Sequence, residues 1–292
     1  MGEPSYVDES LLKTIRVLGK GAYGSVSLMV HPRDGLYAKK TSSIQFKENL
    51  EKELRVMLRF RNHPRIVQAS SDHVHLVTEH PSCYIYMEYA CEGTLDKFIS
   101  GFRGKPLPEF MIQSAVRMIL QGLEALHSNG YVHCDIKPAN VLIFPSETPG
   151  EPWDLKLCDF GSCKEPNTDP APLDGCTVVN MAPESFKFGP KGQIEACFDI
   201  WGLGCIAYEM FGGRPQQEFL EDYYEWNLTE EVSPVAKDFL SLCHAIPSRR
   251  PTVAQLLNHP FVTQSLDAPS PMPDYITIRR LANASRIPPV IK

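Results

Sequence analysis

The chain is organised around the stretch Tyr131-Val132-His133-Cys134-Asp135-Ile136-Lys137-Pro138-Ala139-Asn140. Asp135 can accept a proton from a hydroxyl group, and Lys137 can neutralise a phosphoryl group in transit. Asn140 can hold a metal ion from the same loop. Phosphoryl transfer needs these three roles, because the transferred group is highly anionic and catalysis is mostly positioning and charge neutralisation. The alternative is a polar loop that carries Asp and Asn by chance, and the rest of the chain decides between them.

Length and composition limit the class of protein. The 292 residues suffice for one large domain or two small lobes, and the 43% apolar and 22% charged content is ordinary for a globular protein. The formal net charge of −6 gives no indication of a basic surface that would bind nucleic acid or an anionic membrane. No apolar run is long enough to span a bilayer, and the N-terminus lacks the basic and apolar regions of a signal peptide.

The cysteines indicate a reducing compartment. They number nine, which is odd, and no two of them form a Cys-x-x-Cys pair. Zinc sites and a disulfide framework are therefore both disfavoured, and we expect the cytoplasm, with the nucleus as a second option. Nothing in the sequence indicates an oligomeric state.

A glycine-rich hairpin is predicted near the N-terminus, where residues 11–30 alternate as strands do around a Gly-x-Gly-x-x-Gly pattern. In a dinucleotide-binding turn this pattern opens a helix. Here residues 25–30 continue as a β-branched and apolar run, which indicates strand, loop and strand. Glycines in such a loop let backbone N–H groups approach phosphates, and a plain hairpin with a flexible tip is the alternative. The candidate phosphate-binding residues are Gly19, Lys20, Gly21, Ala22, Tyr23, Gly24 and Val26.

Two lysines end the next predicted strand, residues 36–40. The Ala-x-Lys pattern that starts at Ala38 selects Lys40 as the phosphate-binding lysine. Side chains alternate along a strand, so Lys39 is expected on the opposite face, as an ordinary surface lysine. The other elements expected from periodicity are a helix over 46–60, strands over 74–78 and 84–89, helices over 94–100 and 108–128, a strand over 141–144, a surface loop over 145–153 and an apolar helix over 199–211.

A second acidic residue that could bind a metal ion follows the strand that begins at Leu155. The strand runs into Asp159-Phe160-Gly161. An aspartate at a strand end before a glycine suits a Mg²⁺ ligand that also faces phosphates, and an Asx turn is the alternative. From there to Glu184 the chain is polar, acidic and rich in proline, the composition of a mobile segment.

Together and in this order, these motifs resemble the eukaryotic protein kinase family across residues 11–263. The His-x-Asp-x-x-x-x-Asn loop, Asp-Phe-Gly and Ala-Pro-Glu belong to that family's signature. The resemblance implies an α+β fold of two lobes with ATP and Mg²⁺ in the cleft. The expected parts are an N-terminal extension (1–10), a small antiparallel β-rich N-lobe with one main helix (about 11–87), a hinge (about 88–93), a larger and mostly helical C-lobe (about 94–263) and a C-terminal tail (264–292).

The resemblance also assigns roles that the residues alone do not give. Glu53, with Glu51 as second choice, would pair with Lys40, and Thr177 would brace the catalytic Asp135 and Lys137. Residues 87–90 would border the adenine ring, which gives Met87, Glu88 and Ala90 as further ATP-binding candidates. The remaining family contacts are an Asp199 tie to the catalytic-loop backbone and an Arg250–Glu184 pair.

The loop's Lys-Pro pair looks like the serine/threonine type, and the His-Cys-Asp and Met-Ala-Pro-Glu sequences resemble plant mitogen-activated protein kinase kinase kinases. The implied partner is a protein substrate, with a downstream protein kinase as one class. Three residues depart from the family pattern: Cys134 replaces an arginine, Cys176 a glycine and Asn180 an aromatic residue. The last two sit in the peptide-binding loop, so substrate preference is open.

A catalytically inactive kinase fold that serves as a scaffold or binding module is the alternative function. Inactive relatives commonly lose a member of the phosphate, metal and base set, whereas Lys40, Asp135, Asn140 and Asp159 are all present here. A small-molecule kinase is a weaker alternative, because such enzymes lack the Ala-Pro-Glu segment that seats a peptide. The sequence therefore favours an active serine/threonine protein kinase.

Overall fold

The chain forms two compact units. The N-terminal unit comprises Met1–Ala90 and Asp159–Gly161, and the C-terminal unit comprises Cys91–Cys158 and Ser162–Lys292. The computed structural model describes residues 11–21, 23–168, 180–187, 195–214 and 232–264. The boundary after Ala90 falls inside the range expected for the hinge, 88–93.

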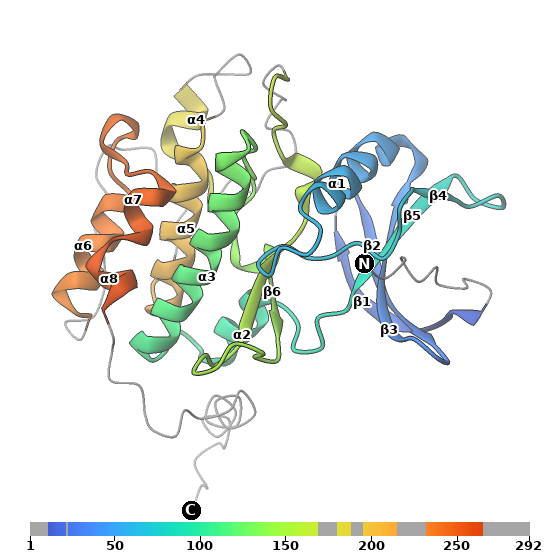
Figure 1. The fold of residues 1–292 in the computed structure, drawn as a ribbon, viewed down its shortest axis with the longest axis horizontal. Helices are drawn as coiled ribbons and strands as arrows, with labels where there is room; N and C mark the ends of the chain where they lie inside the picture. Colours follow the sequence, from blue (N-terminus) through green and yellow to red (C-terminus); the bar gives the residue numbers. More distant parts are fainter. Residues whose placement is uncertain (1–10, 22, 169–179, 188–194, 215–231, 265–292) are drawn as a thin grey trace, which may run out of the picture. The chain divides into compact units, whose positions relative to one another are not determined.

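The N-terminal unit is an antiparallel sheet with one long helix (Figure 1). The strand order is β1-β2-β3-β5-β4, so that the glycine-rich hairpin of β1 and β2 lies at one edge. The short 3-10 turn Ile44–Phe46 leads from β3 into the helix. The elements are β1 (Lys13–Gly21), β2 (Gly24–His31), β3 (Gly35–Ser43), α1 (Lys47–Arg59), β4 (His75–Leu76) and β5 (Ser82–Glu88).

The register of this sheet separates the two lysines of β3. Lys40 pairs with Val26 on one side and with Ile85 on the other, so these three side chains share a face. Lys39 points to the opposite face, where its ammonium lies 3.7 Å from the centroid of the Tyr84 ring, a cation–π contact. The structure therefore places Lys39 on the opposite face from Lys40, as the alternation predicted.

Helix α1 carries its apolar side chains at helical spacing. Leu50, Leu54 and Met57 are buried along one stripe, and Glu53 is buried among them with only 2% of its surface exposed. A carboxylate in such a stripe needs a charged or hydrogen-bonding partner, because burial without one is costly.

The C-terminal unit is mostly helical, with one two-stranded hairpin, β6 and β7 (Figure 1). Helices α3 and α5 contact each other, and α3 also contacts β7, α7 and α8. The elements are α2 (Leu95–Gly101), α3 (Glu109–Ser128), β6 (Val141–Phe144), β7 (Asp154–Leu157), α4 (Pro183–Lys187), α5 (Cys197–Met210), α6 (Pro234–Cys243), α7 (Val253–Leu257) and α8 (Pro260–Thr263).

Almost all residues of helix α5 are buried. It packs closely on the catalytic loop at Gly202, where a Cβ atom would stand 2.6 Å from the carbonyl oxygen of Ile136. Only glycine permits that approach. Nearby, the buried Arg250 guanidinium binds Glu184 through both nitrogens, at 2.6 and 3.3 Å, as the family pattern implied.

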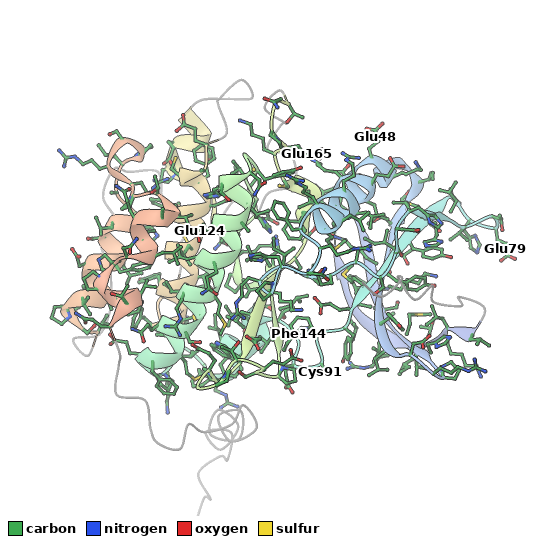
Figure 2. The ribbon with its side chains drawn as sticks, viewed as in Figure 1. Glu48, Glu79, Cys91, Glu124, Phe144 and Glu165 are labelled. Carbon is green, nitrogen blue, oxygen red and sulfur yellow. The ribbon has the colours of Figure 1, made fainter. Side chains whose placement is uncertain are left out.

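The loop over 145–153 differs from its prediction as a simple surface loop. Its last residue, Trp153, is fully buried and packs edge-to-face on Phe98. Glu151 binds Ser114 and Arg117 of α3, which holds the loop against that helix. Before the loop, at the end of β6, the Phe144 ring (labelled in Figure 2) contacts Lys156, whose Nζ atom lies 4.6 Å from the ring centroid.

The fold class is confirmed: an antiparallel sheet with one main helix in one unit, and a helical second unit. The strand expected over 74–78 is shorter, because only His75–Leu76 pair with β5. Ala22, Thr177, the N-terminal extension and residues 265–292 of the tail lie outside the described residues. In the part of the chain that is described, no helix is long and apolar enough to cross a membrane.

Candidate active site

The N-terminal unit brings Lys40, Glu53 and Asp159 together, and we call these three residues the lysine cluster. Lys40 Nζ lies 2.6 Å from Glu53 Oε2 and 2.8 Å from Asp159 Oδ1. Strand β3 supplies the lysine and helix α1 supplies the glutamate, while the aspartate comes from far along the sequence. Glu53 is thereby the glutamate that pairs with Lys40, whereas Glu51 binds Lys47 on its own helix.

Charge explains why the lysine cluster is stable in its buried setting. Burial alone would lower the pKa of Lys40, but the charges and hydrogen bonds of Glu53 and Asp159 outweigh it and raise that pKa. The ammonium therefore stays charged at neutral pH. For Glu53 the effect of burial is larger than that of the Lys40 charge, so the pKa of its carboxyl is raised. Asp159 is the more open carboxylate, with 40% of its side chain exposed.

The glycine-rich hairpin offers open backbone. A Cβ atom at Gly19 or Gly21 would meet nothing within 4 Å, so this side of the hairpin backbone is open. Gly24 is different, because its Cβ would lie 1.9 Å from the carbonyl oxygen of Thr41. Tyr23 packs edge-to-face on Phe46, which precedes α1. Lys20 and Val26 belong to the paired strands of the same hairpin.

The predicted hinge residues close the N-terminal unit. Met87 is buried at the end of β5, opposite Ala38. Glu88 is engaged with Gln68 twice: its N–H donates to the Gln68 carbonyl at 3.0 Å, and its carboxylate accepts the Gln68 N–H at 2.7 Å. Ala90 is 9% exposed and is the last residue of the unit's main segment.

The C-terminal unit brings Asp135, Lys137 and Asn140 together, and we call these three the aspartate cluster. Lys137 Nζ lies 2.6 Å from Asp135 Oδ2. The Asn140 amide nitrogen donates to the Asp135 carbonyl and to its carboxylate, both at 2.9 Å. This geometry fixes the amide, because its nitrogen is occupied and its Oδ1 atom is left as the group able to bind a metal ion.

Asp199 holds the backbone just before the aspartate cluster. Its carboxylate accepts the N–H groups of His133 and Cys134, each at 2.8 Å. Cys134 has a φ of 68°, a left-handed conformation that costs a non-glycine residue about 1–2 kcal/mol. A hydrogen bond to a charged group contributes about 1.5–3 kcal/mol, so the contact with Asp199 is strong enough to maintain this conformation.

Two further contacts complete this support. His133 Nε2 lies 3.1 Å from the carbonyl oxygen of Cys158, and His127 Nε2 lies 2.8 Å from Asp199 Oδ2. Burial would raise the pKa of Asp199, but the hydrogen bond and charge of His127, together with His133, lower it. His127 was not predicted, because a single histidine near a helix end has no distinguishing pattern in sequence.

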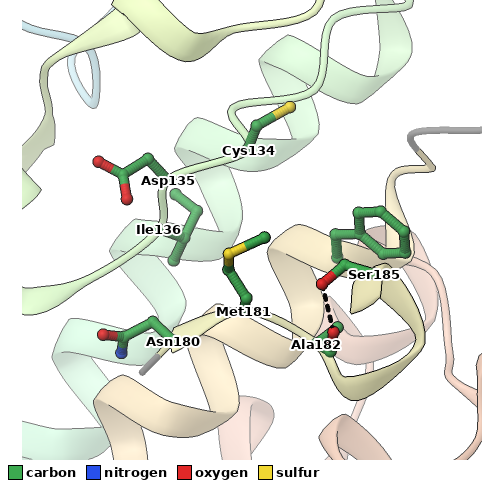
Figure 3. Close-up of a pocket in the computed structure, with 8 residues that line it drawn as sticks. Cys134, Asp135, Ile136, Asn180, Met181, Ala182 and Ser185 are labelled. Carbon is green, nitrogen blue, oxygen red and sulfur yellow. Dashed lines mark hydrogen bonds between the residues drawn. The ribbon is translucent and has the colours of Figure 1, made fainter. Parts of the chain in front are cut away.

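A pocket lies beside the aspartate cluster (Figure 3). Asp135 forms part of one wall, and Asn180, Met181 and Ala182 line the other side, with the Met181 side chain pointing between the two. The Ser185 hydroxyl is occupied, because it donates to the Ala182 carbonyl at 2.5 Å. The lining residues are Cys134, Asp135, Ile136, Asn180, Met181, Ala182, Ser185 and Phe198.

The donor chemistry fits a magnesium–nucleotide group. Within the described ranges, no set of three or more His, Cys, Asp or Glu side chains is arranged to hold a metal alone. Mg²⁺ does not require one, since it is usually bound by one or two carboxylates together with substrate phosphates and water. In the N-terminal unit, Asp159 supplies a carboxylate that suits Mg²⁺ and Lys40 supplies a charge that suits phosphates. In the C-terminal unit, the Asn140 Oδ1 atom is an oxygen donor of the kind that Mg²⁺ takes.

Comparison with known proteins shows the family to which the chain is similar. The protein kinase domain family matches residues 12–262. The chain is 31% identical to mitogen-activated protein kinase kinase kinase 5 of Arabidopsis thaliana over 290 residues, which cover 91% of this chain and 39% of that relative. It is 28% identical to mitogen-activated protein kinase kinase kinase 20 of the same plant over 274 residues, which cover 86% of this chain and 78% of that relative.

A third relative is not named as a mitogen-activated protein kinase kinase kinase. Ribosomal protein S6 kinase 2 alpha of Gallus gallus is 30% identical over 287 residues, which cover 91% of this chain and 36% of the relative. The chain thus spans well under half of mitogen-activated protein kinase kinase kinase 5 and of the S6 kinase, and 78% of mitogen-activated protein kinase kinase kinase 20.

The chain belongs to the protein kinase family. Within that family it is a transferase of the serine/threonine protein kinase class.

Proposed function

We propose that this chain transfers the terminal phosphoryl group of ATP, with Mg²⁺, to serine or threonine hydroxyls of a downstream protein kinase. The observation that carries the proposal is that both clusters are complete: Lys40 is paired with Glu53, and Asp135 is held by Asn140 and Lys137. The cascade assignment is supported by the similarity to several mitogen-activated protein kinase kinase kinases. We place its action in the cytoplasm, with the nucleus as a second option, because the cysteines in the described part of the chain form no disulfide.

The residues of the two clusters would have different roles in phosphoryl transfer. In the N-terminal unit, Lys40, kept charged by Glu53, would hold phosphate oxygens, and Asp159 would bind the metal ion. In the C-terminal unit, Asn140 would offer its Oδ1 atom as a metal ligand. ATP with Mg²⁺ supplies the phosphoryl group and neutralises part of its charge when bound. Asp135 would accept the hydroxyl proton, and the nearby Lys137 ammonium would offset negative charge as the bond forms.

The experiment is a transfer assay with labelled ATP and two kinds of acceptor. One is a mitogen-activated protein kinase kinase made inactive by mutation, so that it cannot label itself, and the other is a peptide array. Asp135→Asn protein serves as the matched control. Labelling of the inactive kinase by the native chain alone would support the full proposal.

The other outcomes separate its parts. Labelling of peptides without the inactive kinase would support protein kinase activity and reject the cascade substrate. Nucleotide binding with no transfer to any acceptor would favour the inactive scaffold instead. Equal labelling by Asp135→Asn protein would reject the assignment of the base.

A further inference from the structure

The carboxylate of Asp154 organises the loop between β6 and β7, residues 145–153. Its Oδ2 atom accepts the Glu147 N–H at 2.6 Å, and its Oδ1 atom accepts the Thr148 hydroxyl at 2.8 Å. Asp154 is only 8% exposed, so hydrogen bonds from the protein replace those that the carboxylate would make with water. Two consecutive residues of the loop are therefore fixed by one buried charge.

Thr148 also connects the two halves of this loop. Its carbonyl oxygen accepts the Ser146 hydroxyl at 2.9 Å and the Glu151 N–H at 3.1 Å. The Glu151 carboxylate in turn accepts hydrogen bonds from Ser114 and Arg117 of α3. A change at Thr148 can therefore pass through Glu151 to the contact between the loop and helix α3.

The hydroxyl of Thr148 stands directly before a proline in an exposed stretch. Residues 145–147 and 149–150 are exposed, and Thr148 itself is half-buried. A hydroxyl before Pro149 is a distinct chemical signal, because proline has no N–H and its φ is fixed at about −65°. A protein kinase whose substrate groove offers no acceptor for an N–H at this position selects such a site, and enzymes of this kind are called proline-directed.

Two other serine or threonine residues stand directly before a proline, Ser233 and Ser270. Ser233 caps α6, where its hydroxyl accepts the Ala236 N–H at 3.2 Å and donates to the Glu109 carboxylate. Ser270 lies outside the described residues. Among the residues that the structure describes, Thr148 is thus the hydroxyl before a proline that lies in an exposed loop.

The surroundings of Thr148 in the sequence are acidic. Residues 144–155 contain Glu147, Glu151 and Asp154 but no lysine or arginine. A phosphate adds about 1.5 to 2 negative charges at neutral pH. On the Thr148 oxygen, which lies 2.8 Å from Asp154 Oδ1, it would replace a hydrogen bond by repulsion between two anions.

We propose that Thr148 is a phosphorylation site for a separate, proline-directed serine/threonine protein kinase, and that the phosphate releases residues 147–151 from Asp154 and from α3. In this step the Thr148 Oγ1 atom forms a bond to the terminal phosphorus of ATP held by that enzyme, and the bond from this phosphorus to ADP breaks. The hydroxyl proton passes to a base of that enzyme. The proposal is independent of the proposed function of this chain, because the separate enzyme supplies the activity.

The first test adds an activated mitogen-activated protein kinase, which is a proline-directed enzyme, and labelled ATP to the intact chain. Mass spectrometry should find a phosphate on Thr148, and only when the added kinase is present. Pro149→Ala keeps the hydroxyl and should lose most of the label at Thr148. Ser146→Ala is the matched control, because it removes an exposed hydroxyl that no proline follows, and it should keep the label.

Hydrogen exchange of the phosphorylated chain provides the second readout. Amides of residues 147–151 should exchange about tenfold faster or more after phosphorylation, because hydrogen bonds to a charged carboxylate are lost. Asp154→Asn is the matched variant, since it keeps an acceptor oxygen and removes the charge that repels the phosphate. Phosphorylation should change the exchange of this variant much less, and peptides from α6 should not change in either chain.

Absence of phosphate from Thr148 in the native chain, a result that requires no variant to fold, would overturn the proposal. Phosphate on Thr148 without the added kinase would also overturn it, because the chain would then modify itself. Undiminished label in Pro149→Ala would reject recognition through the proline. Equal exchange over residues 147–151 before and after phosphorylation would reject the release of the loop.

Discussion

Lys40 of β3 and Glu53 of α1 form an ion pair, with Nζ and Oε2 2.6 Å apart, in the interior of the N-terminal unit. The glutamate side chain is only 3% exposed, so this pair is desolvated and its loss is not compensated by water. Asp159 shares the same ammonium at 2.8 Å. Because Glu53 belongs to α1, the position of this helix determines where the Lys40 ammonium, the group that would bind a phosphate, is held.

We expect Lys40→Met to reduce phosphoryl transfer by roughly a hundredfold or more, about 2.7 kcal/mol, while the protein stays folded. Methionine keeps the apolar stem of the side chain but not its charge. Lys39→Met is the matched control, because Lys39 contacts the Tyr84 ring on the opposite face of the same strand. Rates measured with labelled ATP check this, and a greater loss in Lys39→Met would contradict the assignment.

Asp159→Asn and Asp135→Asn should separate metal binding from proton transfer. Asp159 touches Lys40 in the N-terminal unit, whereas Asp135 touches Lys137 and Asn140 in the C-terminal unit. Both variants should lose transfer, but only Asp159→Asn should lose the Mg²⁺-dependent part of ATP binding. Calorimetry with and without Mg²⁺ measures this. Weak ATP binding in Asp135→Asn alone would reverse the two roles.

Sequence reasoning succeeded where a period or a short motif carries the information. The alternation of a strand was enough to put Lys40 and Lys39 on opposite faces, and the structure shows that arrangement. Glu53 was selected over Glu51 from family pattern, and their different partners in the structure agree with that choice.

The features that sequence did not reveal depend on contacts between distant segments. His127 looks like any polar residue near a helix end, and its meaning comes only from Asp199, which lies 72 residues later. Trp153 looked like part of a surface loop because prolines and a glycine precede it, yet it is buried against Phe98. Contacts between residues far apart in the sequence leave no local periodic pattern, so they could not be predicted from it.

Removal of the buried pair between Glu184 and Arg250 should destabilise the fold strongly. We expect Glu184→Ala to cost about 3–5 kcal/mol, because it leaves an enclosed guanidinium without its carboxylate. Glu51→Ala is the control, since it removes the half-exposed pair with Lys47 and should cost less than about 1 kcal/mol. Urea unfolding of both variants measures the difference, and equal costs would show that Arg250 finds other acceptors.

His244 should make the fold sensitive to acid. Burial lowers its pKa to about 3, although the hydrogen bond to the Leu240 carbonyl acts in the opposite direction. The unfolded chain binds a proton at this residue below about pH 6.5 and the folded chain does not, so stability falls as the pH falls. Since the imidazole is not wholly enclosed, we expect a loss of about 1–2 kcal/mol between pH 8 and pH 5.

His244→Gln should flatten that part of the profile, because the amide keeps a polar group near Leu240 without a titrating proton. His80→Gln, at an exposed position, is the control and should leave the slope unchanged. Urea unfolding across the pH range provides the measurement. An unaltered slope in His244→Gln would assign the acid sensitivity to other groups.

The last prediction concerns control of activity through Cys134. In kinases with arginine at this position, the guanidinium binds a phosphate on the activation segment, which here includes residues 162–180, through charge-assisted hydrogen bonds. Cys134 has no cationic donor, and its thiol donates to the carbonyl of Val132 two residues earlier. Its backbone is already fixed by Asp199. The loop therefore has its conformation without a phosphate at this position.

The activation segment itself offers little to bind an added phosphate. Between residues 162 and 180 its only basic residue is Lys164, and its fixed acids are Glu165, Asp169 and Asp174. Its hydroxyls are Ser162, Thr168 and Thr177, and the family resemblance gives Thr177 the bracing role. The Thr168 hydroxyl donates to the Glu165 carbonyl at 2.6 Å, which leaves it beside an acidic residue. A phosphate there would meet like charge, which destabilises it.

We therefore expect the chain to be active without phosphorylation of this segment. Phosphatase treatment should leave the rate nearly unchanged, with mass spectrometry to confirm that the segment is unmodified. Control would then come from partners, abundance or other residues. Cys134→Arg is the matched variant: it restores the cation, and its activity should rise when an acidic residue replaces Thr168. A fall of about tenfold in the native chain, roughly 1.4 kcal/mol, that followed loss of phosphate from Thr168 or Ser162 would contradict the prediction.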